Sequence, residues 1–301
     1  VSGGSLNGVA ITRVHLEEDT ARSSHDKGDY SLIDFNRAGI PLMELVTEPV
    51  VKSAEEASAF ARELQLLLRY LGAGDANMEK GEMRVEANIS VSKNTTKDPT
   101  KDRPSLAHEG RSFVGELGTK VEVKNINSLK AVEKAIDYEV KRQIETLESG
   151  GKVAQETRGW DEAKQETFSQ REKESSHDYR YFPDPDLPKL KLSEIPELSG
   201  EVLRKEMPEL PWDKRGRLLK DYGLKEESAG LFVQNTELGK FFEKAVTGKA
   251  PDFVKLSANY ITSDLMALMK DETAAGRMPS VEDFRALMDM IVSGKLSSRG
   301  A

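Results

Sequence analysis

Alternating apolar and polar positions predict three β-strands that each have one buried and one open face. In residues 8–19 (GVAITRVHLEED) the even positions from Ala10 to Leu16 share one face, and the odd positions from Arg13 to Asp19 share the other. Residues 83–91 (MRVEANISV) and 119–127 (TKVEVKNIN) alternate in the same way. A period of two is the side-chain period of a strand, so each segment should place its charged residues on one side of a sheet.

Two long helices are expected among these strands. The first covers residues 53–71, where Ser53 and Glu56 form a capping box and Gly72 can end the last turn. The second covers residues 129–148. Its apolar stripe, at helical spacing, comprises Val132, Ile136, Val140, Ile144 and Leu147.

The mixed order of strands and helices favours an α+β fold over a doubly wound parallel sheet. Short apolar runs at 31–35 and 40–46 add further strands, and a polar loop follows from residue 93 to about 118. Because several strands have one polar face, we expect an antiparallel sheet with flanking helices on one side and an open opposite side.

Prolines separate this α+β part from an all-α part. Six of the 12 prolines lie between Pro183 and Pro211, a composition typical of a linker. Beyond them a small helical bundle is expected, with helices at 213–222, 225–233, 237–246, 252–270 and 280–293. We therefore assign residues 1–187 to a first domain, 188–293 to a helical domain and 294–301 to the start of a further one.

Charge and composition limit the classes of function. The 301 residues carry a formal net charge of −8 and contain no cysteine. The missing cysteines exclude disulfides, thiolate zinc sites and cysteine nucleophiles, and they fit a cytoplasmic protein. The negative charge argues against a dedicated nucleic-acid binder, so any RNA contact must be local or shared with a partner. No apolar run approaches membrane-spanning length.

Carboxylates recur beside cationic and amide groups on the polar faces of the three strands. They form three groups: residues 15–19 (HLEED); Arg84, Glu86 and Asn88; and Glu122, Lys124 and Asn125. If neighbouring strands bring these faces together, the oxygen atoms suit Mg²⁺, which takes few protein ligands and keeps waters and substrate phosphates. Arg84 and Lys124 would then hold phosphate oxygens.

A simpler explanation is that these charges form the solvated face of a sheet, as alternating charges on strands commonly do. His15 fits a supporting place better than a magnesium ligand, because Mg²⁺ prefers oxygen. Residues 1–5, rich in Gly and Ser, lack the lysine pattern of an amidase, and the sequence contains no phosphate-binding loop. A block at 156–162 and a second block at 177–188 also stand out, and the clustered arginine and aromatic residues of the second could stack on a nucleotide, but we favour an anchoring role at the domain junction.

The chain contains several long, distinctive blocks, which are, in order, HLEED, YSLIDFNRAGIPLMELVTEP, MEKGEMRVEANISV, GTKVEVKNINS, QETRGWDE and SHDYRYFPDPDLP. These blocks resemble the GatB/GatE family of tRNA amidotransferase subunits. MPELPWDKR and KLSANYITSDL in the helical part are similar too, so the resemblance covers essentially the whole chain. Blocks of this length in this order are highly specific.

The resemblance implies a glutamine-synthetase-like catalytic domain and a carbon–nitrogen ligase reaction with glutamine as amide donor. Such a subunit binds a misacylated tRNA that carries glutamate on tRNA(Gln) or aspartate on tRNA(Asn). ATP and Mg²⁺ activate the side-chain carboxylate as an acyl phosphate, and ammonia then displaces phosphate. An amidase subunit of the GatA type supplies the ammonia, and a small GatC-type subunit links the two.

The resemblance also implies a metal site. Glu86 and Glu122 are expected as ligands, together with Glu18 or, within the same block, Glu17. Strand parity places Glu17 beside His15, but a twist or bulge at the strand end would change the face. We therefore expect the three strands to lie in one sheet with these carboxylates converging.

Contacts with the reactants are implied for the neighbouring cationic and amide side chains. Arg84, Lys124 and Asn125 are expected to act on the reacting phosphate or carboxylate, and Arg84, Asn88 and Lys124 to bind the nucleotide. The family's N-terminal strand, with a further Glu and His, is absent, as is most of its C-terminal tail. We therefore expect an interior piece of a longer protein, inactive alone. The loop at 93–118 is longer than usual, and Glu86 stands where aspartate is frequent.

Two other functions stay open. A non-catalytic tRNA-binding scaffold would keep the helical domain but would not need carboxylates at Glu18, Glu86 and Glu122. A metal-dependent phosphohydrolase would need histidine-rich or paired-aspartate clusters, which the sequence lacks. The preference for glutamate, aspartate or both is not fixed by the sequence.

Overall fold

The computed structural model describes residues 3–24, 30–92, 117–172, 191–270 and 278–297. The chain divides into two compact units. The first comprises Val1–Arg69 and Gly74–Lys189, and the second comprises Tyr70–Ala73 and Leu190–Ala301. Strands and helices mix in the first unit and helices fill the described part of the second, so the α+β class is confirmed. Within the described residues, no helix is long and apolar enough to cross a membrane.

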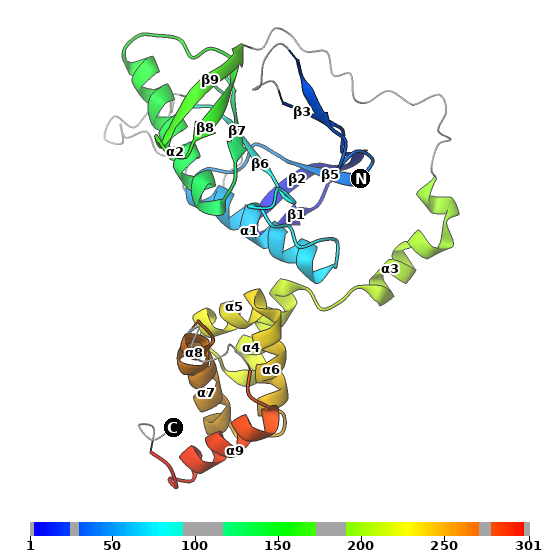
Figure 1. Ribbon diagram of the computed structural model, residues 1–301, viewed down its shortest axis with the longest axis vertical. Coiled ribbons are helices and arrows are strands. Elements are labelled where there is room, and N and C mark those ends of the chain that lie inside the picture. The colour runs from blue at the N-terminus through cyan, green and yellow to red at the C-terminus, as the bar shows by residue number, and fades with distance from the viewer. Residues whose placement is uncertain (1–2, 25–29, 93–116, 173–190, 271–277, 298–301) are drawn as a thin grey trace, which may run out of the picture. The chain divides into compact units, whose positions relative to one another are not determined.

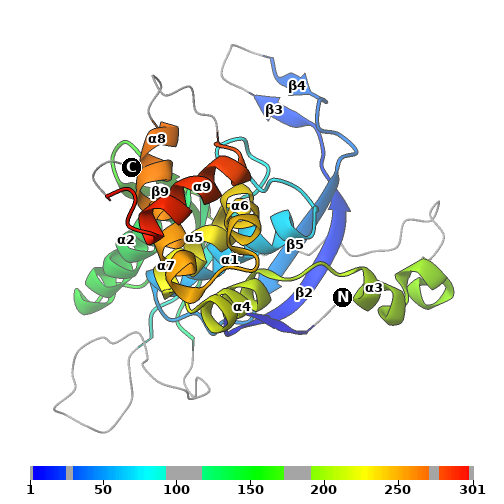
Figure 2. The same cartoon turned by 90° about the horizontal axis from the view of Figure 1, so that it is seen from below.

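The strands of the first unit form three separate sheets (Figures 1 and 2). They are β1 (Ser5–Leu6), β2 (Val9–Glu18), β3 (Arg22–Ser24), β4 (Leu32–Asp34), β5 (Pro41–Thr47), β6 (Val85–Ile89), β7 (Val121–Ile126), β8 (Glu156–Asp161) and β9 (Glu166–Glu172). The sheet orders are β1-β2-β5, β3-β4 and β6-β7-β8-β9. Figure 2 shows β3 and β4 as a separate ribbon beyond the ends of the long strands β2 and β5.

The four-stranded sheet is mixed, so the expectation of a purely antiparallel sheet is wrong here. β6 pairs with β7 and β8 pairs with β9 in antiparallel fashion, whereas β7 and β8 run parallel. Helix α2 (Leu129–Glu148) connects β7 to β8. A helical crossover of this kind returns the chain to the same end of the sheet, so the next strand runs in the same direction.

Helix α2 covers one face of this sheet. Val123, Ile126 and Trp160 from the sheet pack against Val132 and Ala135 of the helix. The helix begins at Ser128, whose hydroxyl accepts a hydrogen bond from the backbone N–H of Ala131 at 3.0 Å.

The predicted apolar stripe of α2 is only partly correct. Its C-terminal members Ile144 and Leu147 are half-buried. The buried face instead continues from Ala135 through two polar residues, Glu139 and Gln143. These three positions are four residues apart, so they lie along one face of the helix.

Helix α1 (Ala54–Tyr70) packs on the β1-β2-β5 sheet. Phe60 meets Leu6 and Val9 in its core. The predicted capping box is confirmed for the Ser53 hydroxyl, whereas the Glu56 carboxylate bonds the residue before Ser53. The Glu56 backbone N–H donates to the Ser53 hydroxyl at 3.1 Å, and the Glu56 carboxylate accepts from the backbone N–H of Lys52 at 2.7 Å.

The second unit is built from helices, as expected. They are α3 (Gly200–Glu206), α4 (Pro211–Tyr222), α5 (Glu226–Gln234), α6 (Thr236–Val246), α7 (Pro251–Tyr260), α8 (Met266–Lys270) and α9 (Val281–Val292). Short 3-10 turns lie at Leu192–Glu194 and Pro196–Leu198, and a π-helical turn at Ile261–Leu265 joins α7 to α8. In the core of the second unit, the rings of Phe232 and Phe242 stack with centroids 4.5 Å apart. Helix α3 was not predicted.

Candidate functional site

The face of the four-stranded sheet opposite α2 carries polar side chains. Asn88 of β6 lies directly opposite Glu122 of β7, and Glu122 lies beside Thr157 of β8. Residues paired in this way point to the same side of a sheet. We call this side the open face and define it by Glu86, Asn88, Glu122, Lys124 and Thr157.

A lysine lies between two carboxylates on the open face. The Nζ atom of Lys124 is 3.2 Å from Oε1 of Glu86 and 3.8 Å from Oε1 of Glu122. The Glu122 side chain is 14% exposed, whereas Lys124 and Glu86 are 41% and 47% exposed. The expectation that the polar faces of these two strands meet is therefore confirmed. The open position of Lys124 and Glu86 leaves them accessible to a ligand.

The hydroxyl of Thr157 completes this arrangement. It donates a hydrogen bond to Oε2 of Glu122 at 2.9 Å, so the two oxygens of this carboxylate face different partners. Thr157 is 8% exposed, although it lies on the open face. We did not anticipate this residue from the sequence.

A β-bulge at Asn125 shapes the end of β7. The pairing of β6 with β7 shifts register between Val85 and Ala87, and Asn125 has a left-handed φ of +62°. Asparagine tolerates this backbone region better than most residues. The extra residue lets both Lys124 and Asn125 avoid the buried face, while Ile126 returns to the core.

The amide of Asn125 has a structural partner. Its Nδ2 donates to the carbonyl oxygen of Trp160 at 3.3 Å, just beyond the last paired residues of β7 and β8. A hollow of about 280 Å³ lies here, lined by Asn125, Asn127, Ser128, Trp160 and Glu162. The amide thus supports the local backbone; its predicted catalytic role stays a prediction.

Arg84 and Asn88 flank the acidic residue of β6. Arg84 lies one residue before the strand and is exposed, and Asn88 is exposed opposite Glu122. Alternation along β6 gives these residues the polar side of the strand, as predicted. Their contacts with reactants remain predictions.

The acidic end of β2 belongs to another sheet, which overturns one expectation. β2 pairs with β5 from Ile11 to Glu18, whereas Glu86 and Glu122 lie in the β6-β7-β8-β9 sheet. Within the described residues, no group of three or more His, Asp or Glu side chains is arranged to hold a metal ion. The prediction that the three strands share one sheet is therefore wrong, whereas the role of Glu17 or Glu18 as a metal ligand stays a prediction. Alternation identifies the polar face of each strand but does not identify its neighbours.

Glu17 and Glu18 have different environments. Glu17 lies across from Leu42 and on the same side as His15, as parity predicted. Its Oε1 atom is buried and accepts no hydrogen bond from the described residues. Glu18 lies across from Pro41 and is exposed. A buried carboxylate oxygen without a donor is costly and calls for a cation or another donor.

Arg37 joins the end of β2 to the segment that precedes β6. Its Nε is 2.9 Å from Oδ2 of Asp19, and its Nη1 donates to the carbonyl oxygen of Gly81 at 3.2 Å. Asp19 directly follows Glu18, and Gly81 lies shortly before Glu86. The guanidinium therefore links the two parts of the chain that carry the predicted acidic residues.

Comparison with known protein families decides the relationship. The GatB/GatE catalytic domain matches residues 2–196. This chain belongs to the GatB/GatE family. The resemblance noted in the sequence blocks is thereby confirmed.

Curated relatives of the GatB/GatE family extend the match into the helical unit. A protein of Herpetosiphon aurantiacus is 42% identical over 302 residues, which cover 99% of this chain and 58% of the relative. A protein of Crocosphaera subtropica is 44% identical over 271 residues, covering 87% and 50%. Both carry the name of an aspartyl/glutamyl-tRNA(Asn/Gln) amidotransferase subunit. The chain thus spans between half and three fifths of the length of these relatives.

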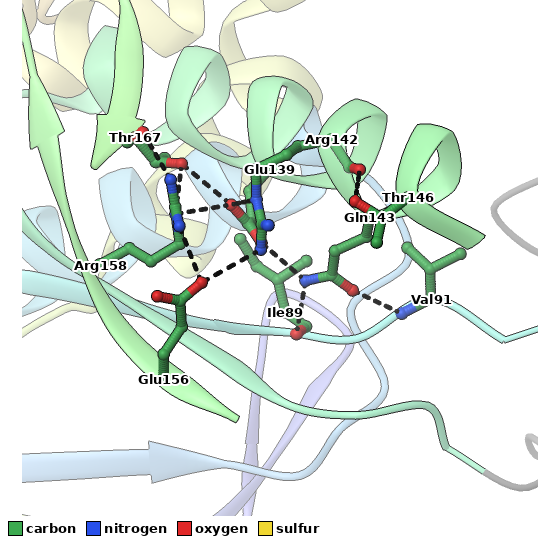
Figure 3. Close-up of polar contacts among 9 residues, drawn as sticks. All are labelled: Ile89, Val91, Glu139, Arg142, Gln143, Thr146, Glu156, Arg158 and Thr167. Carbon is green, nitrogen blue, oxygen red and sulfur yellow. Dashed lines mark hydrogen bonds and ion pairs between the residues drawn. The ribbon is translucent and has the colours of Figure 1, made fainter. Parts of the chain in front are cut away.

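A buried ion network on the α2 side of the sheet was missed by sequence reasoning. It comprises Glu139, Arg142, Gln143, Glu156, Arg158 and Thr167 (Figure 3). The carboxylate of Glu139 is fully buried and accepts from Arg142 Nε and Nη2 at 2.9 and 2.7 Å. Its side chain lies at a helix position that also suits an exposed glutamate, so the pattern of the sequence alone gave no signal.

The electrostatic interactions of the buried ion network keep its acidic and basic side chains ionised. Burial works to raise the pKa of Glu156, yet hydrogen bonds from Ser169 and Arg158 and the charge of Arg142 hold that pKa below its ordinary value. The hydrogen bond to Glu139 raises the pKa of Arg142 further above its usual range. Both residues are therefore ionised at neutral pH, as a buried pair requires.

Proposed function

We propose that this chain is the catalytic part of the tRNA-handling subunit of a glutamine-dependent aspartyl/glutamyl-tRNA amidotransferase. Its family and the names of its curated relatives support this function. The observation that carries the proposal is the open face, where Lys124 lies between the carboxylates of Glu86 and Glu122.

The proposed reaction converts an acid into an amide on a tRNA. An oxygen of the glutamyl or aspartyl side chain attacks the γ-phosphorus of ATP, and ADP leaves with the electron pair of the broken bond. Ammonia then attacks the carbonyl carbon of the acyl phosphate, and inorganic phosphate leaves. A proton lost from nitrogen completes the amide. The chain's part is to position the reactants and to balance the negative charge of the phosphates.

The acidic residues of the open face suit a magnesium ion. Glu86 and Glu122 offer carboxylate oxygens on an accessible surface. Mg²⁺ is commonly held by one or two carboxylates while it keeps waters and substrate phosphate oxygens. Bound there, it would neutralise charge on the phosphates of ATP. We propose that β2 contributes a further carboxylate, and the unsatisfied buried oxygen of Glu17 favours this residue over the exposed Glu18.

The cationic and amide residues have separate roles in the proposal. Lys124, which already neighbours two carboxylates, would move its charge towards the transferred phosphoryl group when ATP binds. Arg84 would bind phosphate oxygens, and Asn88 would bind the nucleotide. Asn125 acts mainly on the backbone, because its amide donates to the carbonyl oxygen of Trp160.

The wider assembly follows from the chemistry. We propose a glutamine-synthetase-like arrangement of the first unit, in which a carboxylate is phosphorylated and then amidated over a sheet. The ammonia would come from a GatA-type amidase subunit, joined through a small GatC-type subunit, in the cytoplasm. Misacylated tRNA is the acceptor.

A single assay tests this function. The full-length protein is assembled with its partner subunits, and ATP hydrolysis is measured with misacylated tRNA, with uncharged tRNA and without tRNA. We expect hydrolysis that depends on Mg²⁺ and on the misacylated form. Glu122→Gln should lower that rate at least about 100-fold, a loss of roughly 3 kcal/mol of transition-state stabilisation. Glu145→Gln, an exposed change on α2, serves as the control. Equal rates for charged and uncharged tRNA would refute the proposal.

A further inference from the structure

We propose that Thr157 is a positioning residue that holds the Glu122 carboxylate in one orientation on the open face. The inference rests on the proposed function, which gives Glu122 its role as a metal ligand. The hydroxyl donates to Oε2 of Glu122 at 2.9 Å. The other oxygen, Oε1, is turned towards Lys124 at 3.8 Å. One oxygen is thereby anchored by the hydroxyl, and the other faces the ammonium group of Lys124.

The register of the sheet makes this contact reproducible. Glu122 of β7 and Thr157 of β8 are directly paired in the parallel ladder. Their side chains therefore leave the sheet on the same side, one strand apart. Threonine is branched at Cβ and has few side-chain rotamers in a strand, so its hydroxyl direction is well defined. Its low exposure, 8%, limits competition from water for the same bond.

The residues on either side of Thr157 are fixed from the opposite face. Glu156 and Arg158 point towards α2 (Figure 3), and Arg158 Nη1 donates to Oε1 of Glu156 at 2.7 Å. Arg158 also donates from Nε to the hydroxyl of Thr167 at 2.8 Å and from Nη2 to its carbonyl oxygen at 2.7 Å. These bonds tie β8 to the neighbouring strand β9.

Helix α2 closes the buried ion network above β8. Besides Arg142, the buried Glu139 carboxylate accepts from Gln143 Nε2 at 2.9 Å and from the Thr167 hydroxyl at 3.0 Å. Arg158 Nε lies 3.5 Å from Oε2 of Glu139. A buried charge paired in this way holds its partners firmly, because breaking one contact leaves a charge without compensation.

Gln143 extends the same fixation to the end of β6. Its Nε2 donates to the carbonyl oxygen of Ile89 at 3.2 Å, and its Oε1 accepts from the backbone N–H of Val91 at 3.1 Å (Figure 3). The amide of Gln143 thus pairs with the main chain of Ile89 and Val91 as a neighbouring strand would. Contacts on the α2 side of the sheet thus hold β6, β8 and β9 in place. The hydroxyl of Thr157 then fixes the Glu122 carboxylate on the open face.

Two matched pairs of variants isolate the hydroxyl. Thr157→Val replaces it by a methyl group at nearly constant shape, and Thr157→Ser can be compared with Thr157→Ala, which differs from it by the hydroxyl alone. Thr12→Val is the control, because the Thr12 hydroxyl bonds Glu48 at 2.8 Å on the exposed surface of β2. Each variant is made in the full-length protein and assembled with its partner subunits.

The readout is the affinity for Mn²⁺, used as a paramagnetic substitute for Mg²⁺ and followed by electron paramagnetic resonance. Removing an outer partner of a metal ligand typically costs about 10- to 100-fold in affinity. We expect a loss of this size in Thr157→Val and Thr157→Ala. Thr157→Ser and Thr12→Val should stay within about threefold of wild type. Thermal unfolding is recorded in parallel and should differ little between Ser and Ala.

Each outcome decides a separate point. Wild-type affinity in Thr157→Val or Thr157→Ala, with a loss in Glu122→Gln, would overturn the positioning role and leave the proposed function intact. Equal losses in Ser and Ala would also overturn it, because packing and not the hydroxyl would then matter. Wild-type affinity in Glu122→Gln as well would remove Glu122 from the metal site. If Thr157→Val does not assemble, the Ser and Ala pair decides.

Discussion

Arg37 holds Asp19 through an ion pair of 2.9 Å between Nε and Oδ2. The same guanidinium bonds the carbonyl oxygen of Gly81, so one side chain spans two segments that are far apart in the sequence. Backbone bonds strengthen the first contact, because the N–H of Asp19 donates to Ile40 and its carbonyl oxygen accepts from Gly39. This junction is where the acidic end of β2 meets the approach to β6.

Loss of Arg37 should loosen both segments. We expect Arg37→Ala to cost about 1 kcal/mol, since the pair is partly exposed and screened by water. Amide hydrogen exchange should become faster around Asp19 and around Gly81 together. Arg13→Ala, which removes a partly exposed ion pair with Glu44 at 3.5 Å, is the control and should affect neither segment. Faster exchange in only one of the two segments would contradict the bridging role.

Glu139 should be among the most sensitive positions for stability. Removing one member of a buried ion network leaves cationic partners without compensation, and Glu139→Ala should therefore destabilise the first unit by about 3–5 kcal/mol. Glu145→Ala on the same helix removes an exposed pair with Lys141 and should cost less than about 1 kcal/mol.

The fluorescence of a buried tryptophan can report this difference. Trp160 lies in the core of the first unit and is 2% exposed. In a Trp212→Phe background its emission follows urea unfolding of that unit. Similar losses in Glu139→Ala and Glu145→Ala would mean that the buried ion network adds nothing to stability.

Glu156 should contribute to stability in a pH-dependent way. Its folded pKa lies below the ordinary value of 4.5, with Arg158 and Arg142 as the cationic groups that face it. A lowered folded pKa stabilises the fold above the unfolded pKa, and this contribution disappears as the pH falls through the folded pKa. The difference in unfolding free energy between wild type and Glu156→Gln should stay constant from pH 7 to about 5 and shrink below that. A difference that grows towards acid would contradict this assignment.

Ammonia should come from a partner subunit. The chain has no cysteine nucleophile, and ammonia released into water would be protonated and diluted, so a closed path between subunits is the physically reasonable route. The purified full-length subunit should release no ammonia from glutamine. Ammonium salt should partly replace glutamine when the subunit, tRNA and ATP are supplied. Sustained glutamine hydrolysis by this subunit alone would reverse the assignment of roles.

Local patterns of the sequence were sufficient to predict individual helices and strands but not how the strands pair into sheets. The capping box at Ser53 and the alternation around Glu86 and Glu122 predicted a helix and two strands with the correct open side. These features depend on neighbours within a few residues. The placement of β2 in a separate sheet depends on its pairing with β5, which no period in the sequence records.

The missed site residues share a physical reason. Thr157 bonds Glu122, 35 residues away, and Arg37 bonds Gly81, 44 residues away, and each alone is an ordinary polar residue. The polar residues Glu139 and Gln143 can lie in the buried stripe of α2 because Arg158, Thr167 and the backbone of β6 form an ion pair and hydrogen bonds with them. The β8–β9 hairpin was missed because its buried side carries charges in place of an apolar alternation. The aromatic block at 177–188 lies outside the described residues.

In the proposed reaction, the side-chain carboxylate is phosphorylated before it is amidated. This order of steps can be tested with misacylated tRNA whose glutamyl or aspartyl side chain carries ¹⁸O in both carboxylate oxygens. The assembled full-length protein is supplied with ATP and glutamine, and the released inorganic phosphate is analysed by mass spectrometry. Because the oxygen that attacks phosphorus leaves with the phosphate, we predict one ¹⁸O atom in phosphate for each amide formed. Amide formation with unlabelled phosphate would contradict an acyl-phosphate intermediate.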